Sequence, residues 1–176
     1  AYWKNQLNKS ALLKDPKART YHSQRLASSD LAKTHEPQDY LETLVAVTQD
    51  AQWWEHRLRA LEQIGRLDSL EQRPELITLL KKHATGDPEA AVRTSAYSIL
   101  TGLDSLNSAE MVAFFEAGAL NDSSYQAAAS ALNGLYLLDS QKGLAVAKTM
   151  REWDNIDIAY QVSDILMLEN AREAPQ

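Results

Sequence analysis

The sequence predicts an all-α protein built from consecutive pairs of helices, and three observations support this prediction. Apolar residues recur at intervals close to 3.6 along most of the chain, which is the period of one helix face. No segment sustains the apolar–polar alternation and β-branched enrichment that are typical of strands. The 176 residues include only six glycines and five prolines, and several of these stand where a helix is expected to begin or end.

The expected helix boundaries follow from proline, glycine and capping residues. Proline is tolerated at the first helical position, where its missing N–H would have no partner, and an Asp before it caps the helix. The expected starts of this kind are Asp15 with Pro16, Pro37, Pro74, and Asp87 with Pro88. Gly65 and Gly102 each follow an apolar stripe and are expected to end a helix.

In chain order, the helices are expected to form pairs. Trp3 and Leu7 lie on one face of an opening helix, and the stretch DPKARTYHSQRLA begins its partner. PQDYLETLVAV then pairs with DAQWWEHRLRALEQI, and three later pairs have second helices that start at Asp87, Asp122 and near Asp154. The predicted apolar faces of the second helices are Trp54, Leu58, Leu61 and Ile64; Val92, Ala96, Ile99, Leu100 and Leu103; and Ile158, Val162, Ile165 and Leu166.

The second helices repeat one another in register. Their small residues Ala60, Ala96, Ala131 and Ser163 are 36, 35 and 32 residues apart, and Arg57 and Arg93 are also 36 apart. A two-helix unit with this period predicts an α-solenoid, a superhelix of the HEAT or ARM type, with about four to five hairpins. We expect one domain over residues 1–170 and a frayed tail over residues 171–176.

Composition excludes several classes of function. The formal net charge is −6 and the sequence pI is about 5.2, and the basic residues are scattered, so a nucleic-acid partner is not expected. The chain contains no cysteine, which excludes disulfides and thiolate metal sites. No apolar run approaches the length of a bilayer span, so we expect a soluble protein with no membrane insertion.

A search for catalytic motifs gives none. The four histidines are His22, His35, His56 and His83, and no H-E-x-x-H zinc motif is present; His56 is expected to lie on the surface. There is no phosphate loop or nucleophile elbow, and the serine in residues 102–106 is expected to lie in a connecting loop. The Asp residues that precede helices are interpreted as caps. We therefore predict no catalytic, metal-binding or cofactor-binding residue in this chain.

Two features point to recognition of a partner. Trp53 and Trp54 are adjacent, so one helix cannot direct both toward the same core. Two interpretations are open: one tryptophan meets a neighbouring domain or peptide, or the two fill both sides of a buried helix. Arg57, Arg59 and Arg93 are candidates for binding carboxylates in a groove. The structural alternative, which the repeat favours, is that each Arg bonds to an Asp or to the backbone of the adjacent repeat.

The stretch ALNDSSYQAAASALNGLYLLDSQKGLAVAKTM resembles the HEAT-like C-terminal domain of bacterial aminopeptidase N family zinc metallopeptidases. YWKNQL and DAQWWEHRLRAL are similar to two further stretches of that domain, and the resemblance extends from Trp3 to about Leu168. It implies that zinc and the catalytic residues belong to a separate thermolysin-like domain upstream in the same polypeptide. It also implies that the helical domain covers that active site and shapes the access of peptide substrates.

Three interpretations of function follow. The first is this accessory domain, which itself hydrolyses nothing; the first residue is Ala1 rather than Met, as expected for a piece of a longer protein. The second is a stand-alone HEAT-repeat scaffold for protein–protein interaction. The third is an enzyme that uses an unrecognised pair of carboxylates. The bacterial cytoplasm and the periplasm both remain open as locations.

Overall fold

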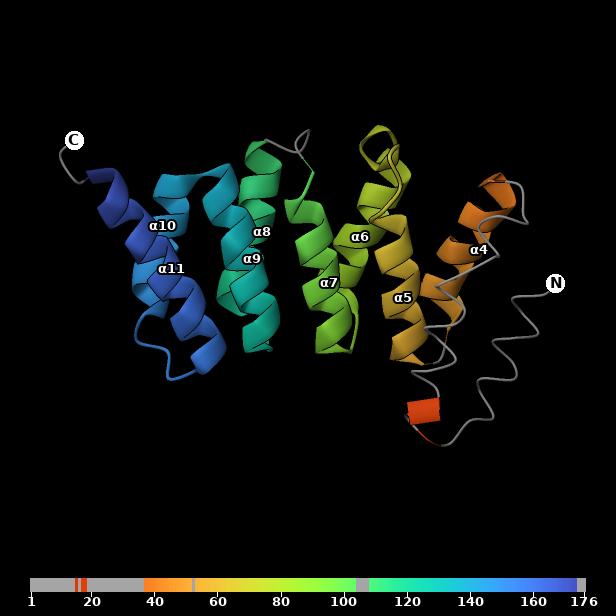
Figure 1. Cartoon of the computed structure of the whole chain (residues 1–176), viewed down its shortest axis with the longest axis horizontal. Helices are drawn as coiled ribbons and strands as arrows, with labels where there is room; N and C mark the ends of the chain where they lie inside the picture. Colours follow the sequence, from red (N-terminus) through yellow and green to blue (C-terminus); the bar gives the residue numbers. More distant parts are fainter. Residues whose placement is uncertain (1–14, 16, 19–36, 52, 104–107, 174–176) are drawn as a thin grey trace. The chain divides into compact units, whose positions relative to one another are not determined.

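The computed structural model of the protein consists of helices joined by short connections (Figure 1). It describes residues 15, 17–18, 37–51, 53–103 and 108–173. Within these ranges there are eight α-helices, one 3₁₀ helix and no strand, so the all-α prediction is confirmed. The elements are α4 (Pro37–Asp50), α5 (Trp54–Ile64), η1 (Leu70–Gln72), α6 (Pro74–Gly86), α7 (Ala90–Thr101), α8 (Ala109–Asn121), α9 (Tyr125–Leu138), α10 (Ser140–Met150) and α11 (Ile156–Glu173). The helix expected around Trp3 and Leu7 lies outside the described residues.

The chain divides into two compact units, residues 1–76 and 77–176, with the boundary inside α6. In the first unit, α4 packs against α5. The side chains buried on these two helices include Leu41, Leu44, Val47, Leu61 and Ile64. The single domain expected over residues 1–170 stays a prediction.

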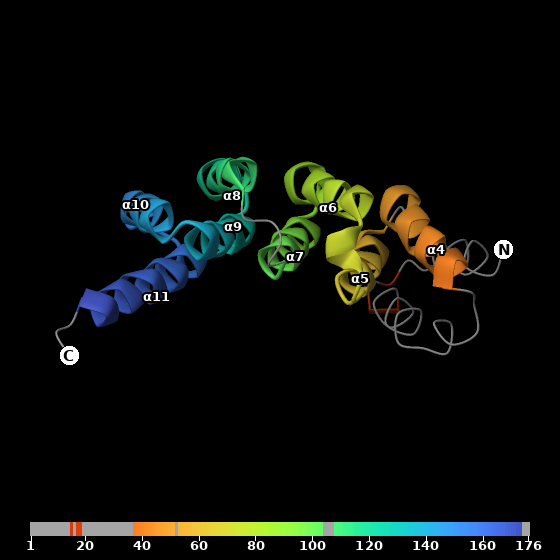
Figure 2. The ribbon, with the colours of Figure 1, turned by 90° about the horizontal axis from the view of Figure 1, so that it is seen from above.

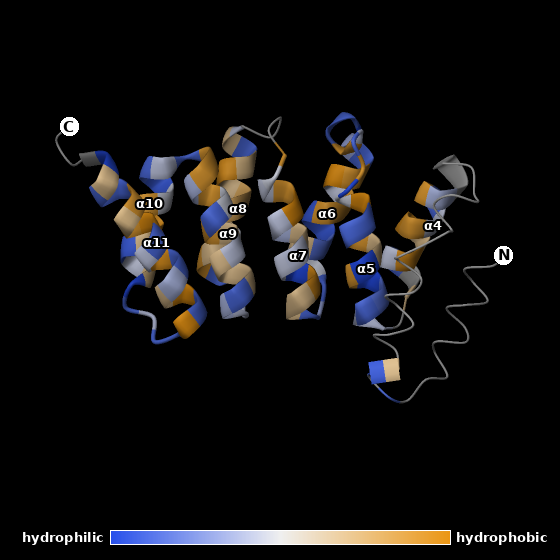
Figure 3. Ribbon diagram, viewed as in Figure 1, coloured by the Kyte–Doolittle hydropathy of each residue, from blue (hydrophilic) through white to orange (hydrophobic). Residues whose placement is uncertain are grey.

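In the second unit, α9 is the central helix. It packs against α7, α8, α10 and α11, and eight of its residues are buried. Figure 2 shows α7, α9 and α11 in one layer of this unit and α8 and α10 in the other. Apolar and polar residues are interleaved along the helices, as an amphipathic pattern requires (Figure 3).

An aromatic cluster fills the space between α7 and α8. The rings of Tyr97 and Phe115 are buried, with centroids 6.1 Å apart, and Phe114 lies 5.6 Å from Tyr97. Gly118 makes this packing possible, because a Cβ at that position would lie only 2.5 Å from the Tyr97 hydroxyl oxygen. The glycine in α8 is thus explained by the close approach of a ring.

The helix boundaries marked by Pro37, Pro74, Gly65 and Gly102 agree with the sequence prediction, whereas Pro88 precedes the first residue of α7, Ala90. Pro37 and Pro74 are the first residues of α4 and α6, and Gly65 and Gly102 are the C-caps of α5 and α7. The two glycines have φ angles of −62° and −80°, so neither adopts the left-handed conformation. Their N–H groups instead donate to carbonyls of the preceding turn.

The second helices begin later than predicted. Asp87 and Asp122 are not the N-caps of α7 and α9; those positions are occupied by Glu89 and Ser124. Each Asp accepts a hydrogen bond through Oδ1 from the backbone N–H two residues ahead, at 3.0 Å from Glu89 and 2.8 Å from Ser124. These are Asx turns, which redirect the chain before the helix begins.

The start of α11 requires a similar correction. Asn155, not the predicted Asp154, accepts the backbone N–H of Asp157, at 2.9 Å. The first helices of the pairs differ, because Ser108 and Asp139 are true N-caps of α8 and α10 whose side chains accept a backbone N–H three residues ahead. Side-chain caps and Asx turns therefore alternate along this unit.

α11 continues to Glu173, and the frayed tail expected over residues 171–176 stays a prediction. Two contacts lie on the last two turns of the helix. Arg172 Nη1 donates to Glu169 Oε1 at 2.8 Å, and the Tyr136 hydroxyl on α9 donates to the same oxygen at 2.7 Å. The carboxylate of Glu169 thereby fastens this end of α11 to α9. Residues 174–176 lie outside the described part of the chain.

Candidate interaction surfaces

Arg93 is buried in a network of polar contacts. Its guanidinium donates from Nε to Asp122 Oδ2 at 2.9 Å and from Nη2 to Asp122 Oδ1 at 2.8 Å. Nη2 also lies 3.3 Å from Ser123 Oγ, and Nη1 donates to the carbonyl oxygen of Asp87 at 2.8 Å. The Asp122 hydrogen bond raises the pKa of Arg93 above its ordinary value, against the effect of burial. Arg93 thus connects α7 to the turn that opens α9, the structural alternative stated above.

Arg57 makes the corresponding contact in the first unit. Its Nη1 donates to the carbonyl oxygen of Ala51 at 3.0 Å, six residues before it in the chain. Arg93 and Asp87 are also six residues apart. Arg93 follows Arg57 by 36 residues, and Asp87 follows Ala51 by 36 residues. The same hydrogen bond therefore recurs at the period that the sequence indicated.

The two tryptophans occupy different positions at the start of α5. Trp53 is the N-cap, with an extended backbone, and Trp54 is the first helical residue. Both side chains are half-buried. The two tryptophans therefore do not both belong to the helix, because only Trp54 has a helical backbone.

His56 is a correction to the sequence analysis. It was expected on the surface, but its side chain is only 3% exposed. The buried residues of α5 are Glu55, His56, Ala60, Leu61 and Ile64, whereas Trp54 and Leu58 of the predicted face are half-buried. A search for apolar periodicity misses a polar side chain that lies on the same stripe as Ala60 and Ile64.

The remaining histidines do not form a cluster in the part of the chain that the structure describes. His83 is buried and its Nδ1 lies 3.1 Å from Asp87 Oδ2, one helical turn away. His22 and His35 lie outside the described residues. Across the described ranges, no three His, Asp or Glu side chains gather as a metal site would require.

The most exposed apolar surface of the second unit lies on α11. Ile156, Tyr160 and Met167 are 64%, 68% and 69% exposed. On the opposite face, three of the four residues predicted to be apolar and inward-facing, Ile158, Val162 and Ile165, are at most 3% exposed, whereas Leu166 is half-buried. Sequence analysis identified the buried face alone. Ile156, Tyr160 and Met167 are four and seven residues apart, so they also form a helical stripe. This spacing is visible in the sequence and could have indicated the second apolar face.

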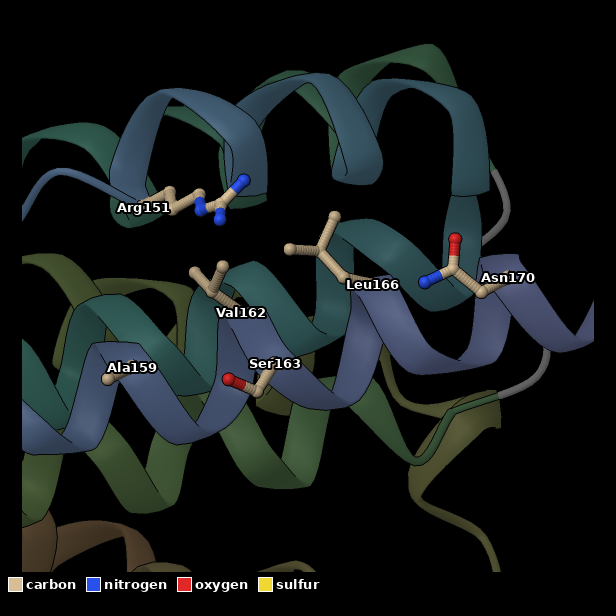
Figure 4. A pocket seen from close by; sticks show the side chains of 6 residues that line it. All are labelled: Arg151, Ala159, Val162, Ser163, Leu166 and Asn170. Carbon is tan, nitrogen blue, oxygen red and sulfur yellow. The ribbon is translucent and has the colours of Figure 1, made fainter.

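A groove of about 430 Å³ lies beside this stripe (Figure 4). Its lining residues are Arg151, at the C-terminal end of α10, and Ala159, Val162, Ser163, Leu166 and Asn170 on α11. Ala159 and Ser163 are small and leave the helix backbone accessible to an approaching side chain. Arg151 is exposed and makes no ion pair within the described residues.

The helices of the described ranges lack the combination of length and apolar character that a membrane span requires. A scan of protein-family models finds no match to the chain, and a search of curated proteins finds none either. The surfaces are therefore interpreted from their own geometry and from the sequence.

Proposed function

We propose that the protein is the non-catalytic, HEAT-like helical domain of a zinc aminopeptidase, which covers the active site of an upstream thermolysin-like domain. In this role it shapes the passage of peptides to the active site. Zinc and the catalytic groups come from the upstream domain. This chain contributes a surface.

The observation that carries the proposal is the recurrence of one hydrogen bond at the repeat period. Arg57 donates to the carbonyl of Ala51 and Arg93 donates to that of Asp87, with a spacing of 36 residues. A contact repeated in this way supports a stacked array of similar hairpins, and such arrays act through extended binding surfaces. The repeat favours a binding role over a catalytic one.

The residues that carry the family resemblance have definite structural roles. In the run of residues 122–125, Asp122 closes the Asx turn and pairs with Arg93. Ser124 is the N-cap of α9, and Tyr125 begins the helix with its ring 6.2 Å from that of Trp153. A short sequence with so many simultaneous roles tolerates few substitutions, so its likeness to the peptidase domain supports common architecture.

Trp53 and Trp54 are the best candidates from the sequence for contact with a peptide or with the catalytic domain, because both are half-buried. A half-buried tryptophan retains part of its ring for a partner, and tryptophans are enriched among residues that dominate interfaces. Arg93 is less suited to this role, since its donors already bind Asp122, Ser123 and backbone carbonyls.

The first test is to read the native gene upstream of the codon for Ala1. The proposal requires an in-frame H-E-x-x-H motif with a downstream glutamate ligand. The encoded protein, with and without this region, is then assayed on aminoacyl p-nitroanilides and on longer peptides. We expect removal of the region to change the discrimination between short and long substrates.

Two outcomes contradict the proposal. A gene without a metallopeptidase motif leaves the stand-alone interaction scaffold as the better interpretation. Stoichiometric zinc that remains on the isolated chain after dialysis, measured by elemental analysis, is incompatible with a domain that holds no metal of its own.

A further inference from the structure

The exposed stripe on α11 is long enough to receive another helix. Successive residues of an α-helix are rotated by about 100°, so Ile156, Tyr160 and Met167 lie within about 40° of one another. They extend over roughly 16 Å of the helix. Apolar side chains that are 64% to 69% exposed in one line form an unpartnered face.

The electrostatic character of this face selects a basic partner. Asp157 and Asp164 flank the stripe on one side, and within the described residues neither carboxylate has an ion pair. Residues 151–173 contain two basic and six acidic side chains. A partner that brings ammonium groups to this flank gains attraction in addition to apolar burial.

A direct twofold pairing of α11 with its copy is disfavoured by the same charges. In an antiparallel pair related by a twofold axis, equivalent flanks of the two helices meet. Asp157 and Asp164 of both copies would then gather along one edge of the interface, where like charges repel. These charges therefore favour a partner surface on a different part of the molecule or on a different molecule.

The chain itself contains a segment of the required chemistry. Residues 1–14, AYWKNQLNKSALLK, carry Lys4, Lys9 and Lys14 and no acidic residue, and the sequence predicts a helix with Trp3 and Leu7 on one face. Residues 1–36 together hold seven basic and three acidic side chains. The two ends of the chain thus have opposite charge, although the whole molecule is acidic.

We propose that the α11 face of one copy binds residues 1–14 of a second copy, so that the chains associate head to tail. Trp3 and Leu7 pack on the stripe and beside the groove of Ala159 and Ser163, and the lysines lie along the Asp157 and Asp164 flank. An association of this type is heterologous and joins unlike surfaces. It goes beyond the proposed function and does not depend on it.

Sedimentation velocity of the full chain tests the association. We expect the weight-average mass to rise over an about hundredfold range of protein concentration, and to rise less when NaCl increases from about 0.05 M to about 0.5 M. A chain that stays monomeric throughout at low salt overturns the proposal.

Substitutions on α11 locate the surface. Tyr160→Ser with Met167→Ser is expected to weaken association about tenfold or more, because it removes the stripe. Leu137→Ser is the matched control, because Leu137 on α9 is also 64% exposed. This substitution should leave the strength of association unchanged. For charge, Asp164→Asn should weaken association and reduce its salt dependence. Asp68→Asn, which changes another exposed carboxylate, in the first unit, should do neither. Equal effects of target and control substitutions contradict the assignment.

A mixing experiment distinguishes head-to-tail from twofold association. One chain carries Tyr160→Ser and Met167→Ser, and the other carries Lys4→Glu and Lys9→Glu; circular dichroism checks that both are folded. Each chain alone should be monomeric, and a mixture should form a one-to-one dimer through the intact basic segment of the first and the intact α11 face of the second. Self-association of either chain alone, or no dimer in the mixture, overturns the proposal. None of these readouts involves peptidase activity, so failure here leaves the proposed function intact.

Discussion

Arg93 and Asp122 form a two-point ion pair between α7 and the turn before α9, with N–O distances of 2.8 and 2.9 Å. The Arg93 side chain is 10% exposed and that of Asp122 is 4% exposed. Since the guanidinium also donates to the carbonyl of Asp87, it connects two successive Asx turns. The pair therefore fixes the position of one helical hairpin relative to the next in the second unit.

Replacing this arginine tests how much the pair stabilises the fold. Arg93→Met leaves the Asp122 carboxylate buried without its main partner, so we expect a loss of about 3–5 kcal/mol in the free energy of unfolding. Urea unfolding followed by far-ultraviolet circular dichroism measures the change. Arg59→Met is the control, because the Arg59–Glu62 pair is about one-third exposed and its loss is expected to cost ~0–1 kcal/mol. Similar losses in the two variants contradict a structural role for the buried pair.

The sequence predicted the all-helical content and several helix ends well, because these depend on local chemistry. Pro37 and Pro74 begin helices since proline fits the first helical position, and the apolar face with Ile158, Val162 and Ile165 is buried as its spacing indicated. The starts of α7 and α9 were predicted too early. A capping Asp and an Asx-turn Asp have the same sequence signature, and only the backbone conformation distinguishes them.

The surfaces were harder to predict than the elements. A helical stripe in a sequence does not reveal whether a neighbour covers it, so the exposure of Ile156, Tyr160 and Met167 required the structure. The burial of His56 was missed for the converse reason, because polar side chains do not contribute to an apolar pattern. The role of Arg93 was among the stated alternatives, and its partner Asp122, 29 residues away, is a tertiary feature.

The start of α11 offers a test of one correction. Asn155→Ala removes the side-chain oxygen that accepts the N–H of Asp157, and we expect it to destabilise the protein by about 1 kcal/mol. Asp154→Ala removes an exposed neighbour, near which the sequence analysis placed the start of this helix, and it should change stability by less than about 0.5 kcal/mol. Urea unfolding of both variants gives the comparison. The opposite ranking would restore Asp154 as the residue that opens the helix.

Gly143 lies at a close contact of α10 with α9. A Cβ at this position would lie 2.7 Å from the Cβ of Tyr136 and closer still to its Cα, so backbone would have to move. We expect Gly143→Ala to destabilise the protein by about 1–3 kcal/mol, despite the better helix propensity of alanine.

Gly86→Ala is the matched control for this substitution. Gly86 ends α6, and a Cβ added there meets no atom within 4 Å. The control should be neutral or stabilise the protein by up to about 1 kcal/mol, because alanine restricts the unfolded chain. Thermal unfolding of both variants measures the difference, and an equal response to the two substitutions would contradict the close helix contact.

The raised pKa of Tyr97 predicts that the protein loses stability at alkaline pH. Burial raises the pKa of its hydroxyl from 10.0 to about 12, the negative charge of Asp122 adds to the increase, and Arg93 opposes it. Between these two values the unfolded chain has lost the Tyr97 proton while the folded protein retains it. The folded state then binds more protons, so its stability falls as the pH rises. The contribution is complete below pH 10 and is lost as the pH passes through about 12.

Tyr97→Phe isolates this effect from the other six tyrosines, because phenylalanine fills the same space between Phe114, Phe115 and Gly118 without a titratable group. The free energy of unfolding of both proteins is measured by urea titration at intervals from pH 8 to pH 12. The difference between them should be constant up to about pH 10, and above it the wild-type protein should lose stability relative to the variant. Two pKa units set an upper limit of about 2.7 kcal/mol on that loss, which solvent screening reduces. If the free energies of unfolding of the two proteins differ by the same amount at every pH, the Tyr97 hydroxyl has the same pKa in the folded and unfolded states, and the prediction is wrong.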